Sequence, residues 1–218
     1  MIMNNWTPQF RHDPHSSRLA STSDVAVQYS FENDLIGNVS VKLKDVWESR
    51  QAQTILNKQR EDGSWKYLSK KSTAFSKMDY DLYETITVLA GLVEIYRFDK
   101  SHLAIQRTAE YLFRNQSSQG DIRHVYANQY SPNYSAMVAE LLIKAGYQDD
   151  PHVIRILDWL IKNRQQDGGW ALPFRTQGLN LQSFGLDETI EADYSKPSSA
   201  SSARRCSRFH RTCLHRYW

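Results

Sequence analysis

Cysteine is missing from most of this 218-residue chain, since Cys206 and Cys213 both lie near its end. This placement excludes a disulfide framework for the body of the protein, and we expect a reducing, cytoplasmic location. Long apolar runs are also missing: the longest uncharged apolar run, Thr87 to Val93, is far shorter than the roughly 20 residues of a membrane-spanning helix. The N-terminal residues lack the basic and apolar regions of a secretory signal. We therefore predict no transmembrane span.

Acidic residues are absent from Ser195 onward, where the chain carries its excess of basic ones. Residues 1–194 hold 21 Lys and Arg against 24 Asp and Glu, so the body is mildly acidic although the whole chain has a net charge of +3. A basic face for nucleic acid is thus missing from the body, and we expect no nucleic-acid partner. The metal-capable side chains of the basic tail are Cys206, His210, Cys213 and His215. Their spacing is not that of structural zinc modules, so we predict neither a metal nor another cofactor.

Three segments of the chain align on Gly63, Gly120 and Gly168, at spacings of 57 and 48 residues. They read ILNKQREDGSW (55 to 65), LFRNQSSQGDI (112 to 122) and LIKNRQQDGGW (160 to 170). The repeated positions are Gln59, Asp62, Gly63 and Trp65 in the first copy, Gln116 and Gly120 in the second, and Gln165 or Gln166, Asp167, Gly168 and Trp170 in the third. Such self-similarity is typical of repeat architectures and decides the fold class.

Apolar residues recur at helical spacing before each copy and predict an amphipathic helix with one buried face. They are Ala52, Ile55 and Leu56, then Ile105, Ala109, Leu112 and Phe113, then Val153, Ile156, Leu157 and Leu160. The glycine of each copy favours the positive φ that ends a helix. Residues 82–96 and 134–147, which follow the first two copies, are apolar over more of their circumference and should be more buried. This alternation predicts outer helices before the turns and inner helices after them.

The repeated residues resemble the QW motif of the superfamily of squalene cyclases, oxidosqualene cyclases and protein-prenyltransferase β-subunits, whose fold is an α/α toroid. The resemblance covers roughly residues 46–194. It implies an all-α fold, here an incomplete α/α toroid, in which the Gln and Trp side chains stack and tie helix ends together. One such copy alone is typical of a polar helix terminus with a glycine stop, and the repetition favours the superfamily. The turn itself implies little about activity, because it occurs in proteins with unrelated tasks.

Composition divides the chain into three parts. Residues 1–45 are a lead-in segment with one helix candidate from Ser23 to Gly37, capped by Ser23 or Asp24. Residues 46–194 hold the repeat hairpins. Residues 195–218 are an irregular tail, which we expect to be disordered or the product of a shifted reading frame, because a third inner helix should follow the third copy. A ring of about six hairpins needs roughly 300 residues, so missing C-terminal repeats or a second subunit would complete it.

Two acids are the candidates for catalysis. Class II terpene cyclases protonate an alkene or epoxide through a DxDD cluster, and the nearest approach here is MDYDLYE, with Asp79 and Asp81 but Leu82 in the fourth position. The other interpretation is that these acids cap the start of an inner helix. The zinc site of prenyltransferase β-subunits needs a cysteine, which residues 1–194 lack.

Aromatic side chains are candidates for binding an apolar ligand. Tyr83 and Tyr134 hold matching places at the starts of the two inner helices, where ring faces could contact a prenyl chain or a carbocation; ordinary helix packing is the alternative. His102 and His152 recur at the starts of successive outer helices, where capping is the more frequent role.

Three functional hypotheses follow. The first is an isoprenoid-handling protein that binds a polyprenyl-type ligand in the toroid cavity and, if it is an enzyme, is prenyltransferase-like or terpene-cyclase-like. The second is a non-catalytic binding or protein-interaction module that keeps the fold without the acid and metal sites. The third is a truncated fragment of a longer toroid, whose open ends would lack the capping faces that a repeat protein needs.

Overall fold

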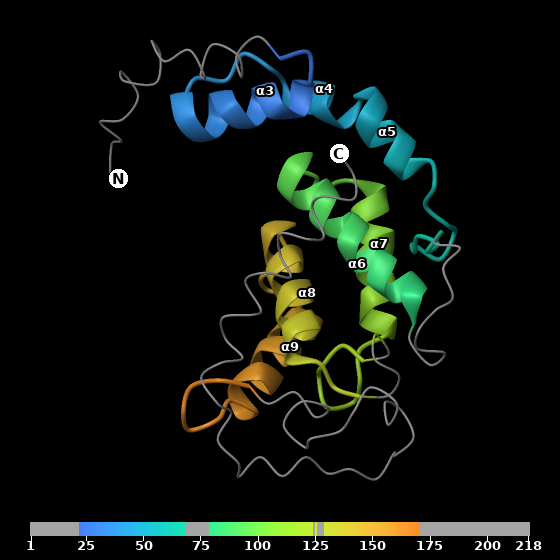
Figure 1. Cartoon of the computed structure of the whole chain (residues 1–218), viewed down its shortest axis with the longest axis vertical. Helices are drawn as coiled ribbons and strands as arrows, with labels where there is room; N and C mark the ends of the chain where they lie inside the picture. Colours follow the sequence, from blue (N-terminus) through green and yellow to red (C-terminus); the bar gives the residue numbers. More distant parts are fainter. Residues whose placement is uncertain (1–21, 69–78, 124, 126–128, 171–218) are drawn as a thin grey trace.

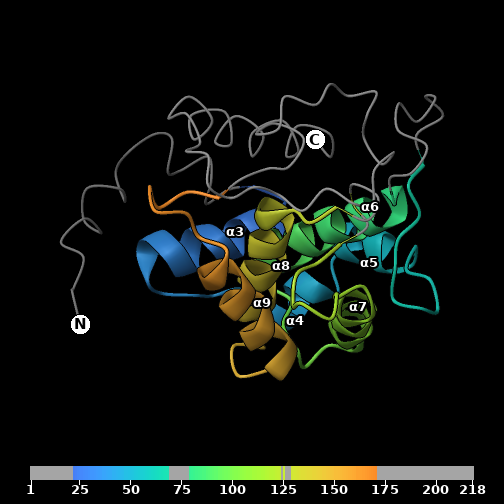
Figure 2. The same ribbon diagram turned by 90° about the horizontal axis from the view of Figure 1, so that it is seen from below.

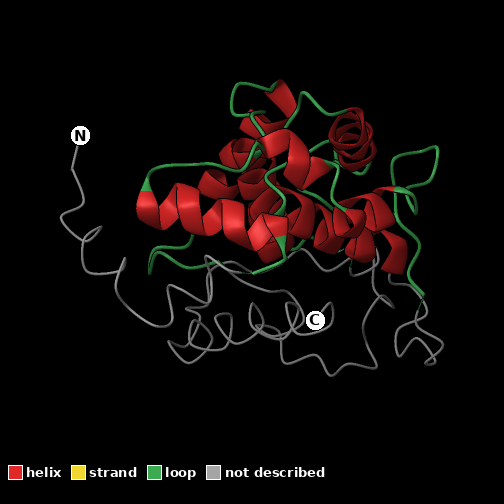
Figure 3. Cartoon of the chain, turned by 90° about the horizontal axis from the view of Figure 1, so that it is seen from above, coloured by secondary structure: helices red, strands yellow, loops and turns green. Residues whose placement is uncertain are grey.

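The computed structural model describes residues 22–68, 79–123, 125 and 129–170, and these residues form helices joined by turns (Figure 3). The described part contains no β-strand, and an isolated bridge pairs Gln116 with Ile122 across the second repeat turn. The prediction of an all-α fold is therefore confirmed for the part of the chain that the structure describes. The basic tail and the segment from residue 171 to 194 lie outside the described residues.

The lead-in segment forms the helix that the sequence predicts between Ser23 and Gly37. Helix α3 spans Val25–Phe31, and the Asp24 side chain caps it by accepting from the backbone N–H groups of Ala26 and Val27. The π-helical segment η1, Glu32–Ile36, continues it, and Gly37 ends it with a φ of 72°. Of the two capping candidates, Asp24 takes the role.

The first outer helix is preceded by a shorter helix. Helix α4 spans Leu43–Trp47 and α5 spans Arg50–Leu56, and the Ser49 side chain accepts from the Ala52 N–H at the start of α5. The Trp47 ring stacks on Phe98 with 5.1 Å between ring centroids, and its Nε1 donates to the Arg97 carbonyl. These contacts hold α4 against the end of the first inner helix.

Each of the next two helix pairs joins an inner helix to an outer one. Helix α6 spans Tyr80–Ala90, continues as the π-helical segment η2, Gly91–Ile95, and is followed by α7, Leu103–Arg114. Helix α8 spans Pro132–Lys144 and is followed by α9, Pro151–Lys162. Proline occupies the first turn of α8 and of α9, where its missing N–H costs no hydrogen bond. We call α5, α7 and α9 the outer helices and α6 and α8 the inner helices.

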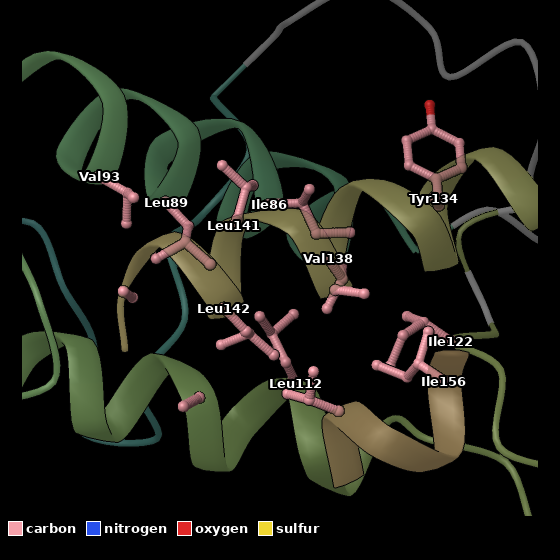
Figure 4. Close-up of a cluster of buried hydrophobic side chains, with 14 of the residues drawn as sticks. Ile86, Leu89, Val93, Leu112, Ile122, Tyr134, Val138, Leu141, Leu142 and Ile156 are labelled. Carbon is pink, nitrogen blue, oxygen red and sulfur yellow. The ribbon is translucent and has the colours of Figure 1, made fainter. Parts of the chain in front are cut away.

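The hydrophobic core lies between these pairs. Inner helix α8 packs against α6 and η2 on one side and against α9 on the other (Figures 1 and 2). Its buried residues outnumber those of α9, as the broader apolar face of the sequence predicts. Figure 4 shows the aliphatic centre of this cluster, with Tyr134 at its margin and the tyrosine hydroxyl pointing away from it. Fully buried members include Leu82, Ile86, Leu89, Leu112, Ile122, Leu142 and Ile156.

The two inner helices differ by one residue, which η2 absorbs. Thr85 and Ser135 hold equivalent places near the helix starts, and Arg97 and Gly146 both adopt positive φ just past the helix ends. Twelve positions separate Thr85 from Arg97, whereas eleven separate Ser135 from Gly146. The extra residue lies within a segment where Tyr96 N–H donates to the Gly91 carbonyl, an i to i+5 bond typical of a π-bulge.

Candidate functional site

The first repeat turn is bound to the outer helix of the following pair through one glutamine. The Nε2 of Gln59 donates to the carbonyls of Gly63 (3.2 Å) and Ala104 (2.9 Å) and lies 3.0 Å from the Thr108 hydroxyl oxygen. Ala104 and Thr108 belong to α7, so this side chain closes its own turn and fastens it to the next outer helix. The hydrogen bonds of Gln59 therefore hold the first turn and α7 together.

The second turn repeats this arrangement. The Nε2 of Gln116 donates to the carbonyls of Gly120 (2.8 Å) and His152 (2.9 Å), and Arg155 donates to the Gln116 Oε1 at 2.7 Å. His152 stands two residues after the N-cap of α9, and Ala104 stands two residues after the N-cap of α7. The degenerate sequence of the second copy therefore keeps the same docking geometry.

Glycine is required where each turn touches the next outer helix. Gly63 and Gly120 have φ values of 91° and 112°. A Cβ on Gly63 would lie 2.1 Å from the Arg107 carbonyl oxygen, and one on Gly120 would lie 2.6 Å from that of Arg155. Both the backbone conformation and the close approach of α7 or α9 exclude a side chain here.

A third recurring contact joins each of the first two turns to the inner helix that follows it. The backbone N–H of Trp65 donates to the Thr85 hydroxyl at 3.0 Å, and that of Ile122 donates to the Ser135 hydroxyl at the same distance. Both hydroxyl residues are fully buried. These two hydroxyl residues were not predicted. A hydroxyl residue inside an otherwise apolar helix start is the signal that could have identified them.

In the third turn, the predicted role of Gln165 or Gln166 is wrong. Arg164, four residues before Gly168, takes the place of Gln59 and Gln116, because its Nε donates to the Gly168 carbonyl at 3.1 Å. Gln166 lies exposed at the tip of the turn. Counting four positions back from the glycine, rather than matching the letter Q, finds Arg164 from the sequence.

The aspartates and tryptophans of the turns make local structural contacts. Asp62 Oδ1 accepts from the Ser64 N–H at 3.0 Å, and Asp167 Oδ1 accepts from the Gly169 N–H at 2.9 Å. Partial burial opposes ionisation of Asp62, but the hydrogen bonds from the Ser64 hydroxyl and N–H outweigh it and lower the pKa. These carboxylates are therefore turn-forming groups.

The two tryptophans occupy equivalent places with different exposure. The Nε1 of Trp65 donates to the Ile55 carbonyl at 2.9 Å, and that of Trp170 donates to the Leu160 carbonyl at 2.7 Å. Trp65 is buried, whereas Trp170 remains 41% exposed. Each ring thus caps the end of the outer helix before it, and the Trp170 ring is partly exposed.

The two candidate acids serve the start of α6. Asp79 is the N-cap and accepts from the Leu82 N–H at 2.8 Å. The Asp81 carboxylate accepts from Arg60 and from the Tyr67 N–H, both at 2.8 Å. Asp79 therefore has the capping role, whereas Asp81 binds Arg60 and the Tyr67 N–H instead of capping the helix.

A partly buried phenol lies close to these acids. Burial, with the charges of Asp79, Asp62 and Asp81 adding to it, raises the pKa of Tyr111 to about 12. The Tyr111 hydroxyl therefore keeps its proton at neutral pH and is no general base. Arg114 lies over its ring, 6.0 Å from the centroid.

Tyr83 and Tyr134 come together, as their places on neighbouring inner helices predict. Their ring centroids are 6.1 Å apart and their planes stand at 83°, an edge-to-face contact. Counted from the equivalent hydroxyls of Thr85 and Ser135, the two tyrosines are one position out of register. Their pairing is thus a contact between helices and not a repeat equivalence.

The two histidines belong to the outer-helix starts. His102 caps α7, because its Nδ1 accepts from the Ala104 N–H at 3.2 Å, and burial lowers its pKa. His152 stacks on Phe113 with 4.3 Å between centroids, while Asp150 caps α9. Both contacts serve packing and capping.

Within the described ranges, no group of three or more His, Cys, Asp or Glu side chains is placed to hold a metal ion. None of the described helices combines the length and the apolar character that crossing a membrane requires. A scan against protein-family models gave no match, and searches of curated proteins and of solved structures gave none either.

Proposed function

We propose that this chain is an isoprenoid-handling helical-repeat protein that binds an apolar polyprenyl-type ligand without an acid catalyst of its own. The observation that carries the proposal is the edge-to-face pair of Tyr83 and Tyr134, which come from neighbouring inner helices. Alkene-rich chains bind well where aromatic ring faces adjoin an aliphatic surface. The aliphatic core between α6 and α8 adjoins Tyr134 (Figure 4), and Tyr83 also packs against this core.

The proposed architecture is an incomplete α/α toroid. Its support is the recurrence of three contacts: the glutamine to the second residue after an N-cap, the glycine against an outer-helix carbonyl, and the turn N–H to an inner-helix hydroxyl. Each contact in the first copy is found again in the second copy, one helix pair further along the chain. Successive pairs related in this way build a curved array, which is what a toroid requires.

The contacts of the two candidate acids, Asp79 and Asp81, support the absence of catalysis by this chain alone. Asp79 is engaged as a helix cap, and Asp81 is engaged by Arg60 and the Tyr67 N–H. Neither is arranged as a proton donor to an alkene. Further repeats or a second subunit would have to supply an acid or a metal site.

Ligand-induced thermal stabilisation tests the proposal. A ligand that binds only the folded protein at about 100 times its Kd adds about 2.7 kcal/mol of stability. We expect farnesol or geranylgeraniol to raise the Tm of the purified chain, and a saturated straight-chain alcohol of equal carbon number to raise it less. Leucine at both Tyr83 and Tyr134 should abolish the difference, because it keeps apolar volume and removes the rings.

A tyrosine elsewhere provides the control. Tyr29→Leu, on α3, should leave the Tm increase unchanged. Equal responses to the polyprenyl and saturated alcohols would contradict recognition by the aromatic pair. A Tm that no polyprenyl alcohol raises would contradict ligand binding as a whole and favour the non-catalytic interaction module.

A further inference from the structure

The first two turns each contact two backbone carbonyls of the next outer helix. On α7 the turn glutamine donates to the Ala104 carbonyl, and the turn glycine approaches the Arg107 carbonyl. On α9 the second turn uses the carbonyls of His152 and Arg155 in the same way. We call each such pair the receiving carbonyls. In both copies they stand 16 and 13 residues before the turn glycine of their own helix.

The first outer helix also has a pair of receiving carbonyls. Counting 16 and 13 residues back from Gly63 identifies Trp47 at the end of α4 and Arg50 at the start of α5. The Nε2 of Gln53 donates to the Trp47 carbonyl at 2.8 Å. The Thr54 hydroxyl donates to the Arg50 carbonyl at 2.7 Å. Side chains of α5 thus bind the two carbonyls that a preceding turn would use.

The other two outer helices have no such donors at the equivalent positions. In place of Gln53 they carry the acidic residues Glu110 and Asp158, and carboxylate oxygens accept hydrogen bonds instead of donating them. The next residue is aromatic in both copies, and its ring packs in or against the hydrophobic core. Within the described part of the chain, the two donors therefore occur on the outer helix that receives no turn.

The exposed surface of α4 and α5 is polar as well. Every exposed residue of these two helices carries a polar side chain: Lys44, Asp45, Arg50, Gln51 and Thr54. A polar outer face is typical of the terminal unit that caps a repeat array. At the opposite end of the array in Figure 1, α9 instead exposes apolar side chains, and its Ile161 is 72% exposed.

The third turn has the internal form of a docking turn. The Nε of Arg164 donates to the Gly168 carbonyl at 3.1 Å, as the amides of Gln59 and Gln116 donate to the glycine carbonyls of their own turns. Among the described residues, a Cβ on Gly168 would meet only the flexible Arg164 side chain, so no other backbone lies against this glycine. The third turn of a second copy therefore fits a free pair of receiving carbonyls.

We propose that Gln53 and Thr54 form an autoinhibitory contact that prevents the third turn of a second copy from docking on α4 and α5. Contact between the two ends of the array would be heterologous, and a heterologous contact that does not close into a ring produces fibres. A docking turn would have to displace both side chains, so it would exchange hydrogen bonds and gain none. The chain thus keeps one end of its helical array closed to the other end of its own copies.

Sedimentation velocity of the full chain at increasing protein concentration tests this inference. The double variant with Gln53→Met and Thr54→Ala removes both donors and introduces residues that favour a helix. One hydrogen bond changes an association constant by about tenfold. We therefore expect the constant for head-to-tail association to rise by about tenfold or more in the double variant. Its sedimentation coefficient should grow with concentration, whereas that of the unmodified chain should not.

Two further changes assign the effect to this contact. Adding Gly168→Ala to the double variant should reverse the association, because a Cβ on the docking glycine would clash with the Arg50 carbonyl, as it would in the contact of Gly63. Gln51→Met is the matched control, since it places the same side chain on the exposed face of α5 and leaves both receiving carbonyls bonded. This control variant should sediment like the unmodified chain.

Three sedimentation results would overturn the inference. The first is polymerisation of the unmodified chain that Gly168→Ala abolishes, since the end would then be open already. The second is a double variant that is folded by circular dichroism and associates no more than the unmodified chain. The third is association of the double variant that Gly168→Ala leaves unchanged. If the double variant does not fold, NMR of the unmodified chain decides: the side-chain amide protons of Gln53 should exchange with solvent more slowly than those of Gln51, and equal rates would contradict the contact.

Discussion

Replacing Gly63 by alanine should destabilise the protein more than the same change at Gly37 or Gly168, which also have positive φ. Two costs add at this position. An L-residue in the left-handed region costs about 1–2 kcal/mol, and Gly63 has a φ of 91°. The new Cβ would also lie 2.1 Å from the carbonyl oxygen and 2.5 Å from the carbonyl carbon of Arg107, which are backbone atoms of α7 and cannot rotate away.

The second cost is that of overpacking a fixed backbone, about 1–3 kcal/mol. The turn must move off α7, and this movement also stretches the bonds from Gln59 to Ala104 and Thr108. We therefore expect the free energy of unfolding to fall by about 2–5 kcal/mol in Gly63→Ala.

Three other glycines separate the two costs. Gly37 has a φ of 72°, and no atom of the described residues lies within 4 Å of a Cβ there, so Gly37→Ala measures the conformational cost alone, about 1–2 kcal/mol. Among the described residues, a Cβ on Gly168 meets only the Arg164 side chain, and this glycine should behave like Gly37. Gly120, 2.6 Å from a backbone oxygen, should resemble Gly63.

Urea unfolding followed by circular dichroism gives the four values from the midpoint and slope of each transition. The slope should stay constant, because the folded and unfolded surfaces are unchanged. Destabilisation of Gly63→Ala equal to that of Gly37→Ala would refute the reasoning, since it would mean that α7 does not hold the turn in place.

Two further predictions concern single side chains. Gln59→Ala should cost about 1–3 kcal/mol of stability, because it removes the amide that donates to the Gly63 and Ala104 carbonyls and to the Thr108 hydroxyl. Gln166→Ala, at an exposed turn tip, should change the urea midpoint little; similar losses in both would contradict the register with Arg164. For His102, burial lowers the folded pKa below its ordinary 6.5, so the unfolded chain binds the proton first. Stability should fall as the pH drops below about 6.5 and level off below the folded pKa, and His102→Asn, which keeps a capping acceptor, should reduce this loss in urea midpoints measured at several pH values; an unchanged pH profile would contradict it.

Much of the helical layout follows from local sequence signals. The outer helices follow from apolar residues at i, i+3 and i+4, and the helix ends from Asp24, Gly37 and the turn glycines. The tie between α4 and the first inner helix could not be predicted, because the stacking of Trp47 on Phe98 joins residues far apart in sequence. The break between α4 and α5 at Ser49 was likewise missed.

For the candidate site, the sequence identified most of the turn residues and the capping alternative for Asp79. It did not identify Arg164, because arginine shares only its N–H donors with glutamine and no letter-based match finds it. The hydroxyls of Thr85 and Ser135 were missed for a different reason: their role depends on a turn that arrives from another part of the chain.

The π-bulge η2 shows how such a chain tolerates change in repeat length. The extra residue of the first inner helix is taken up inside Gly91–Ile95, so the positions that receive the turn at one end and Arg97 at the other remain matched to those of the second pair. Insertions and deletions of single residues can therefore accumulate within the helices during evolution, while the surfaces through which neighbouring repeats recognise each other stay in phase. Unequal spacing between copies is, for this fold, compatible with equal docking.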